Sequence, residues 1–365
     1  MTIAIPRSPA ELTRDWLTEA LCAGTRLGPV RVSAAEVESI GRGTGLLCQL
    51  ARVTLEYEPG APAGPRTLVA KLAAEDADIR GMVGLFRFYE REVRFYEELA
   101  SSLSIAVPRC YWSAYDQDGG DFVLLLEDLG ALRAADQLAP GSAHDARLVA
   151  DLLVDLHARW WDDRSLDALP WLPPVDSEIN KLGLGLYTQA WPSFLERLGN
   201  RLPREALEVG ERLGSRSMAL LEELAHSPRT LCHGDVRLDN IFFGAGDDNN
   251  PPILLDWQIA GRGVGTYDLA YFMSQSFDPE VRRASERDIL ARYHAGLLAR
   301  GVRGYDFEQC VLDYRRSVLF GFVYPVIGGG LGDLANERGH TLARVMAERS
   351  AAAILDWNAA DLLPV

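Results

Sequence analysis

The chain has 365 residues, of which 48% are apolar and 24% are charged, and these proportions are typical of a globular protein with a large core. Its length predicts two domains or lobes. The formal net charge is −15. Because this excess of negative charge opposes association with a polyanion, we expect no nucleic acid partner.

The cysteines and the apolar segments indicate where such a chain works. The five cysteines form no CxxC pair and predict reduced thiols in a reducing compartment. The N-terminus lacks a basic segment followed by an apolar run, and the longest uncharged stretch, 317–332, is interrupted by proline and glycine. We therefore expect a cytoplasmic protein without a membrane partner, and the sequence leaves its oligomeric state open.

The first third of the chain predicts a small lobe built on strands. Ser8 and Glu11 form a capping box with Pro9 at the first helical position, which predicts a helix to about Gly24. One helical period covers 80–100. Strand patterns cover 30–32, 37–40, 46–57, 67–72, 108–115 and 121–126.

From Ser142 onward the pattern is mainly helical. Helices are expected over 142–161, 178–198, 204–226, 278–301, 307–324 and 334–357, with another opening at Thr266. These elements predict an α+β protein with a small N-terminal antiparallel sheet lobe with helices and a larger, mainly helical C-terminal lobe. We place the first lobe at 1–127, a hinge at 128–132 and the second lobe at 133–365.

Between these helices, residues 231–271 carry polar groups suited to phosphoryl transfer. The segment reads LCHGDVRLDNIFFGAGDDNNPPILLDWQIAGRGVGTYDLAY. The transition state of phosphoryl transfer is loose and highly charged, so a protein mainly holds divalent cations and orients the nucleophile. Asp235 can accept the proton of an acceptor hydroxyl. Asn240 and Asp256 offer the oxygen ligands that Mg²⁺ prefers.

The order HGDxxxxN followed by DW resembles the aminoglycoside phosphotransferase and choline kinase family, and the forms HGDxRxDN and DWQ are similar to its ecdysteroid-kinase-like members. The resemblance implies a two-lobed, protein-kinase-like fold, with Asp235 as the catalytic residue and Asn240 and Asp256 as metal ligands. Gly234 stands where protein kinases have arginine, and Trp257-Gln258 stands where they have Phe-Gly. We therefore expect no mobile activation switch.

The same resemblance implies an ATP site in the first lobe. Lys71, in the stretch VAKL, is similar to the kinase lysine that holds phosphates, and Glu92 to the glutamate that pairs with it; a solvent-facing charge is the alternative for Glu92. The glycine-rich turn offers Gly41, Gly43, Thr44 and Gly45 to the phosphates, with a plain hairpin turn as the alternative. The backbone groups of Glu127 and Leu129 would hold adenine.

Together these residues predict that the γ-phosphoryl group of Mg-ATP is transferred to a hydroxyl of a small molecule. The DWQ form and the aromatic residues of the second lobe favour a lipophilic or amphipathic alcohol, by resemblance. The acidic composition keeps an aminoglycoside or amino alcohol open, and a hydroxyacyl-CoA is reachable by resemblance, without a basic cluster for its phosphates. The preference between ATP and GTP stays open.

Two other classes of protein compete with this interpretation. A catalytically silent, nucleotide-binding member need not keep all of Lys71, Asp235, Asn240 and Asp256, and this chain has them all. A metal-dependent hydrolase would need clustered histidine or carboxylate ligands, which the sequence pattern lacks. Within the leading hypothesis, we expect His233 to order the catalytic loop and Asp268 to support it.

Overall fold

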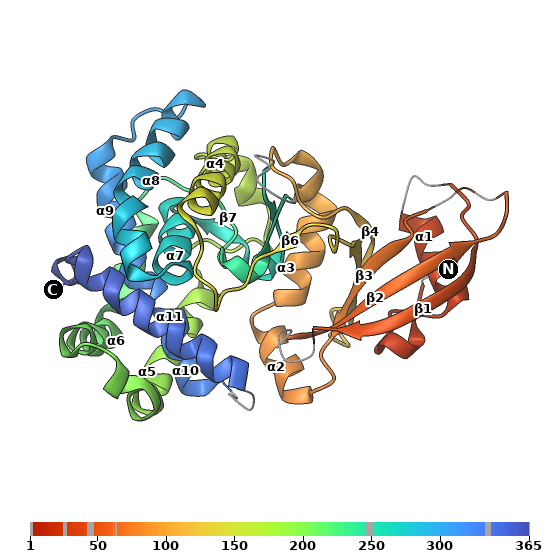
Figure 1. The fold of residues 1–365 in the computed structure, drawn as a ribbon, viewed down its shortest axis with the longest axis horizontal. Coiled ribbons are helices and arrows are strands. Elements are labelled where there is room, and N and C mark those ends of the chain that lie inside the picture. The colour runs from red at the N-terminus through yellow and green to blue at the C-terminus, as the bar shows by residue number, and fades with distance from the viewer. Residues whose placement is uncertain are drawn as a thin grey trace. The chain divides into compact units, whose positions relative to one another are not determined.

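The computed structural model describes residues 3–24, 28–41, 47–60, 62, 64–244, 251–332 and 337–364. They form two compact units, which Figure 1 shows coloured along the chain. The first unit comprises Met1–Ser102, Val107–Leu132 and Leu255–Gln258, and the second comprises Leu103–Ala106, Arg133–Leu254 and Ile259–Val365. The short segment that carries Asp256 therefore packs with the first unit. The hinge over 128–132 stays a prediction.

Within its described residues, the first unit holds a five-stranded antiparallel sheet in the order β1-β2-β3-β5-β4. The strands are β1 (Val32–Ile40), β2 (Cys48–Tyr57), β3 (Thr67–Ala73), β4 (Cys110–Tyr115) and β5 (Phe122–Glu127). Alternate residues point to a buried face, among them Val53, Leu68 and Leu125, and this face packs with Leu17 and Leu21 of α1 (Arg14–Gly24). The predicted sheet lobe is confirmed.

The helical part of the first unit differs from the prediction in two places. The N-terminal helix is a 3₁₀ turn, Pro9–Glu11, followed by α1. The helix expected over 80–100 is wrong as one element, because it divides into α2 (Ala77–Leu85), α3 (Phe88–Arg94) and a π-helical turn, Phe95–Leu99. The break is at Arg87, which has a left-handed backbone (φ 57°) and whose guanidinium binds Glu90 at 2.7 Å.

The second unit is mainly helical, as the pattern predicts. Its helices are α4 (Ala143–Arg159), α5 (Glu178–Leu198), α6 (Arg204–Ala225), α7 (Thr266–Ser276), α8 (Pro279–Ala299), α9 (Phe307–Gly321), α10 (Val323–Leu331) and α11 (Glu337–Asp356). Ser142 begins α4 with a capping box that is closed by Asp145. The single helix expected over 307–324 is wrong, because Pro325 would clash with the carbonyl of Gly321, where α9 ends.

Two small sheets of the second unit carry the loops of interest. In its described residues, β7 (Thr230–Cys232) pairs with β10 (Gly261–Gly263), while β8 (Ile241–Phe243) lies between β6 (Arg133–Ala134) and β9 (Ile253–Leu254). These pairs are antiparallel. The α+β class with a protein-kinase-like division into a sheet unit and a helical unit is confirmed.

Candidate functional site

The first unit places Lys71 between two carboxylates. Lys71 lies in β3, opposite Leu50 of β2 and Leu124 of β5, and its side chain is buried. Its amine is 2.6 Å from Glu92 Oε2 and 2.8 Å from Asp256 Oδ1. Glu92, on α3, is 1% exposed and therefore does not face solvent.

The charges of this cluster are strongly coupled. Burial opposes the charged form of Lys71, but Asp256 and Glu92 outweigh it and hold the lysine pKa well above its ordinary value. Burial also raises the pKa of Glu92 to about 7, against the opposing charge of Lys71 and with the like charge of Asp256 adding to the shift. The Lys71 amine is therefore a cation, and the carboxylates of Glu92 and Asp256 hold it in place.

Asp256 is held by its neighbours in the DWQ segment. Its backbone is left-handed, with φ 65°, a conformation that is strained for a residue other than glycine. Gln258 Nε2 donates a 3.1 Å hydrogen bond to Asp256 Oδ2. The ring of Trp257 is fully buried and stacks on Phe95, with the ring centroids 4.0 Å apart. The stacked ring anchors the segment against the first unit.

The other residues predicted to bind nucleotide are described only in part. Gly41 follows β1 with φ 68°, while Gly43, Thr44 and Gly45 lie outside the described residues. Glu127 ends β5, and the buried Leu129 accepts a 2.8 Å hydrogen bond from the N–H of Leu132. Their contacts with a nucleotide stay predictions.

In the second unit, the chain turns sharply between β7 and the candidate catalytic residue. Gly234 has φ 89°, a backbone conformation that glycine adopts without strain. A Cβ atom at this position would lie 2.6 Å from the carbonyl oxygen of Ile259. Both facts require glycine before Asp235, and they explain the HGD form of the loop.

Asp268, near the start of α7, fixes this turn. Its carboxylate accepts hydrogen bonds from the backbone N–H groups of His233 (2.7 Å) and Gly234 (2.9 Å). The ring of His233 in turn accepts a 3.2 Å hydrogen bond from the N–H of Asp235. The expectations that Asp268 supports the loop and that His233 orders it are confirmed.

Asp235 and Asn240 contact each other directly. The Asn240 amide donates to the backbone oxygen of Asp235 at 3.0 Å and to its carboxylate at 2.9 Å. Arg237 Nε donates to the same carboxylate at 3.2 Å. Because the Asn240 amide nitrogen is used within the loop, its carbonyl oxygen is the atom that it can offer to a cation.

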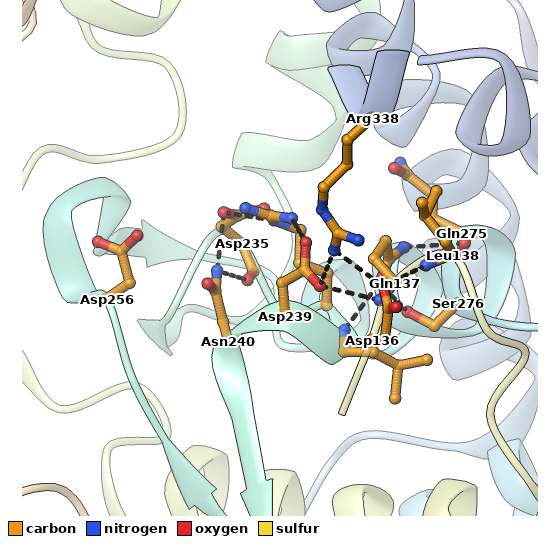
Figure 2. A network of polar contacts seen from close by, with 12 residues as sticks. Asp136, Gln137, Leu138, Asp235, Asp239, Asn240, Asp256, Gln275, Ser276 and Arg338 are labelled. Carbon is orange, nitrogen blue, oxygen red and sulfur yellow. Dashed lines mark hydrogen bonds and ion pairs between the residues drawn. The ribbon is translucent and has the colours of Figure 1, made fainter. Parts of the chain in front are cut away.

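A wider polar network, drawn in Figure 2, continues from this loop and was not foreseen from the sequence. Arg237 reaches Asp239 at 2.8 Å, and Asp239 also accepts from Arg338 of α11 at 3.2 Å. The N–H of Gln137 donates to Asp239 at 2.9 Å, and the Gln137 side chain accepts from Leu238 at 2.8 Å. The contacts made by Arg338 and Gln137 join segments about a hundred residues apart, for which no local sequence signal exists.

His157, Cys232 and Asp268 bring three ligand-type atoms within 4.8 Å of one another. All three residues are buried. The two ring nitrogens of His157 are hydrogen-bonded, to the Tyr293 hydroxyl at 2.8 Å and to Asp268 at 3.2 Å. Because Asp268 also holds the catalytic turn, the cluster is accounted for as a hydrogen-bonded part of the core.

Behind the same turn, the second unit has a pocket with about 500 Å³ of empty space, part of it open to solvent. We call it the loop pocket. Its lining is Pro173, Val175, Asn180, Leu224, Cys232, Gly234, Ile259, Gly261, Arg262, Gly263, Val264, Tyr267, Phe320 and Tyr324. Tyr187 and Phe194 of α5 lie outside this lining and are core residues, 1% and 0% exposed.

The sequence of the chain matches a known family. A sequence model described as "APH: Phosphotransferase enzyme family" matches residues 62–307, which include every described candidate residue except Gly41. No curated protein matches the chain. Among the described residues, no helix is both long and apolar enough to cross a membrane.

Solved structures with the same fold include three kinds of phosphotransferase. The GDP complex of wild-type aminoglycoside 2'-phosphotransferase-IIIa is 16% identical, with 93% of this chain and 99% of that chain covered and a TM-score of 0.54. Ethanolamine kinase from Plasmodium vivax is 12% identical (89% and 83% covered, TM-score 0.53). Choline kinase from Cryptosporidium parvum Iowa II is 12% identical (90% and 89% covered, TM-score 0.50). At these identities the likeness shows the fold.

Proposed function

Because this chain belongs to the phosphotransferase enzyme family and is a small-molecule kinase, we propose that it moves the γ-phosphoryl group of Mg-ATP to a hydroxyl of a lipophilic or amphipathic molecule. The observation that carries the proposal is the Asp235 carboxylate, which Asn240 and Arg237 hold on a loop anchored by Asp268. In the proposed reaction Asp235 accepts or orients the proton of the attacking hydroxyl.

Lys71 is the proposed phosphate contact. Its amine is buried and cationic and is placed by Glu92 at 2.6 Å. A fixed cation at this position would offset charge on the nucleotide phosphates without reorganising during the reaction. Gly41, Gly43, Thr44 and Gly45 are proposed to approach the phosphates through backbone N–H groups, and Glu127 and Leu129 to hold the base.

The proposed metal ligands fit Mg²⁺ by their chemistry. Asp256 offers a carboxylate and Asn240 a carbonyl oxygen, and hard oxygen donors of this kind suit Mg²⁺. Bound Mg²⁺ would neutralise part of the charge on the nucleotide phosphates. Asp256 is already held by Gln258 at 3.1 Å, so its carboxylate needs little ordering before it binds a cation.

The alternative acceptor is an aminoglycoside or amino alcohol. Proteins with the same fold favour it, because they include an aminoglycoside phosphotransferase, an ethanolamine kinase and a choline kinase. A screen of hydroxylated compounds, incubated with the protein and Mg-ATP and followed by mass spectrometry, tests both. Mass gain of a phosphoryl group on a lipophilic alcohol supports the proposal. Mass gain only on aminoglycosides or amino alcohols supports the alternative.

The metal role has its own test. Asp256→Ala removes a proposed ligand, so a titration with ATP in the presence of Mg²⁺ should show much weaker binding than for the unaltered protein. Unchanged binding would rule out Asp256 as a ligand of the nucleotide-bound cation. If no hydroxylated compound gains a phosphoryl group although ATP binds, the result favours the catalytically silent alternative.

A further inference from the structure

We propose that the loop pocket binds the body of the acceptor and that its charge selects an uncharged, apolar alcohol over a cationic one. This inference rests on the proposed function, because it assigns the substrate class of the same site. It goes beyond a general preference for lipophilic molecules by naming the pocket and the charge that it excludes.

The pocket lies directly beside the candidate catalytic residue. Gly234, which lines it, is the residue before Asp235, and its carbonyl accepts a 3.3 Å hydrogen bond from the Tyr267 hydroxyl. Burial, followed by the nearby charge of Asp235, holds the pKa of Tyr271, one helical turn after Tyr267, well above its ordinary value. The two tyrosine rings are 5.8 Å apart. The lining thus contains the chain neighbour of Asp235, Gly234, and a tyrosine whose ring lies next to that of Tyr271.

The lining is apolar on most sides. Leu224 of α6, Val264 and Phe320 of α9 are nearly or fully buried within the fold, at 1%, 1% and 8% exposed. Val175 and Ile259 add aliphatic side chains to the lining, which also includes residues of the strands β7 and β10. Apolar walls with a few polar groups are typical of sites that bind small molecules through burial of hydrocarbon.

The charge of the lining disfavours a cation. Among the described residues that line the pocket, none is aspartate or glutamate, and the charged side chain is Arg262. Arg262 forms an ion pair with Asp167, and its Nε donates to the carbonyl of Leu172 at 2.9 Å. Because Asp167 offsets the charge of Arg262, an ammonium group in the pocket would be desolvated without gaining a carboxylate partner from the lining.

The polar atoms of the lining suit a neutral ligand. Burial, with the neighbouring Tyr324 adding to the shift, holds the pKa of Tyr267 well above its ordinary value, so its phenol stays neutral. The Asn180 amide is committed to the backbone oxygens of Pro174 (3.1 Å) and Val175 (2.9 Å) and so fixes the rim. Neutral hydroxyl and carbonyl groups can orient an alcohol without compensating a charge.

The aromatic residues of the loop pocket could also bind a different class of ligand, a quaternary ammonium. Tyr267 and Phe320 pack edge to face at 5.6 Å, and with Tyr324 they could cage a quaternary ammonium through cation–π contacts. Because the lining offers no carboxylate to compensate an ammonium charge, we assign the pocket to the uncharged ligand and make the cation the contrary outcome of the test.

The test compares two ligands of equal shape. Choline has a charged quaternary nitrogen where 3,3-dimethylbutanol has a neutral quaternary carbon. The affinities of the two compounds for the full chain, measured by calorimetric titration without nucleotide, therefore show the effect of charge alone. We expect the neutral alcohol to bind about tenfold more tightly or better. Along the series from butanol to octanol, affinity should rise roughly fourfold per methylene, the equivalent of about 0.8 kcal/mol, until the pocket is filled. Equal or tighter binding of choline overturns the inference, as does failure of every neutral alcohol to bind.

Placing a carboxylate in the lining gives a second measurement. Val175 is half-buried in the lining, so Val175→Glu should reverse the preference and make choline the tighter ligand. The control is Met218→Glu, at a position on α6 that is 41% exposed and outside the lining. This control should leave the preference unchanged. An unchanged preference in Val175→Glu contradicts the inference. Transfer assays separate the two claims: phosphoryl transfer to cationic alcohols alone refutes the pocket assignment, and neutral binding without any transfer refutes the proposed function.

Discussion

The carboxylate of Asp268 accepts a 2.7 Å hydrogen bond from the backbone N–H of His233. A fully buried side chain of α7 thereby fixes the turn that presents Asp235. The same carboxylate binds the N–H of Gly234, so two donors that would otherwise be buried without partners are satisfied by one residue. The position of the candidate catalytic residue is set from the helical core of the second unit.

Asp268→Asn should therefore destabilise the protein and reduce turnover. An amide offers one acceptor oxygen where two N–H groups now bind, and a buried donor left without a partner costs about 1–3 kcal/mol. Urea unfolding measures the loss. As a control, Asp151→Asn removes an exposed partner of Arg292 and should cost less than about 1 kcal/mol. Equal losses for the two variants would contradict the anchoring role of Asp268.

Gly234→Ala tests the backbone of the catalytic turn. The new Cβ would lie 2.6 Å from the Ile259 carbonyl at a residue with φ 89°, and the left-handed conformation alone costs about 1–2 kcal/mol. We expect lower stability in thermal unfolding and nearly complete loss of turnover. Gly185→Ala is the matched control, because its Cβ would meet no atom within 4 Å on an exposed face of α5, and helix propensity favours alanine by about 1 kcal/mol. A variant at Gly234 as stable as the control would refute the requirement for glycine.

The pKa of Glu92 predicts a pH dependence of stability. Its folded pKa is about 7 against an ordinary value of 4.5, so between these pH values the folded protein holds a proton that the unfolded chain has lost. The contribution of Glu92 to stability is thus fully present below 4.5 and is lost as the pH rises to 7.

Glu92→Gln removes this titration. The free energy of unfolding of the unaltered protein, measured by urea titration relative to that of the variant, should therefore fall across the interval. If this difference in the free energy of unfolding rises or stays constant with pH, the pKa of Glu92 is not raised in the folded protein.

Arg338 is predicted to be a positioning residue. It connects α11 to Asp239 at 3.2 Å and to Asp136 at 2.8 Å, and Asp239 binds Arg237, which contacts Asp235. Arg338→Ala should lower kcat about fivefold, the equivalent of about 1 kcal/mol, with little change in the affinity for ATP.

Arg344→Ala provides the control on the same helix. Within the described part of the chain, Arg344 forms its ion pair locally, with Glu348 at 2.9 Å, and both side chains are about as exposed as that of Arg338. Its loss should leave kcat unchanged. If Arg338→Ala also leaves kcat unchanged while stability falls equally in both variants, the network around Asp239 has a structural role alone.

Local features of the fold could be predicted because their causes are local in the sequence. The Ser142 capping box, the strand that carries Lys71 and the turn that requires Gly234 each depend on a few neighbouring residues. The single helix expected over 80–100 failed because Arg87 adopts a left-handed backbone, which periodicity does not reveal. The helix expected over 307–324 was ended before Pro325, but α9 already ends at Gly321 and α10 begins at Val323.

Contacts between distant segments could not be predicted in the same way. Asp235, Asn240 and Asp256 were identified by their order, whereas the contacts of Asp239 with Arg338 and of Leu238 with Gln137 span 99 and 101 residues. No periodicity or propensity specifies such pairs, since they depend on how whole helices pack. The charge of the loop pocket is likewise a property of segments that meet only after folding.

The most direct test of the account is phosphoryl transfer by Asp235→Ala. With an acceptor found in the screen, binding of Mg-ATP is measured by titration, and transfer of the γ-phosphoryl group is measured by mass spectrometry, in the unaltered protein and in the variant. Because Asp235 is assigned to the acceptor hydroxyl, the variant should bind Mg-ATP with unaltered affinity and transfer no detectable phosphoryl group. Transfer by Asp235→Ala at the unaltered rate would contradict the account.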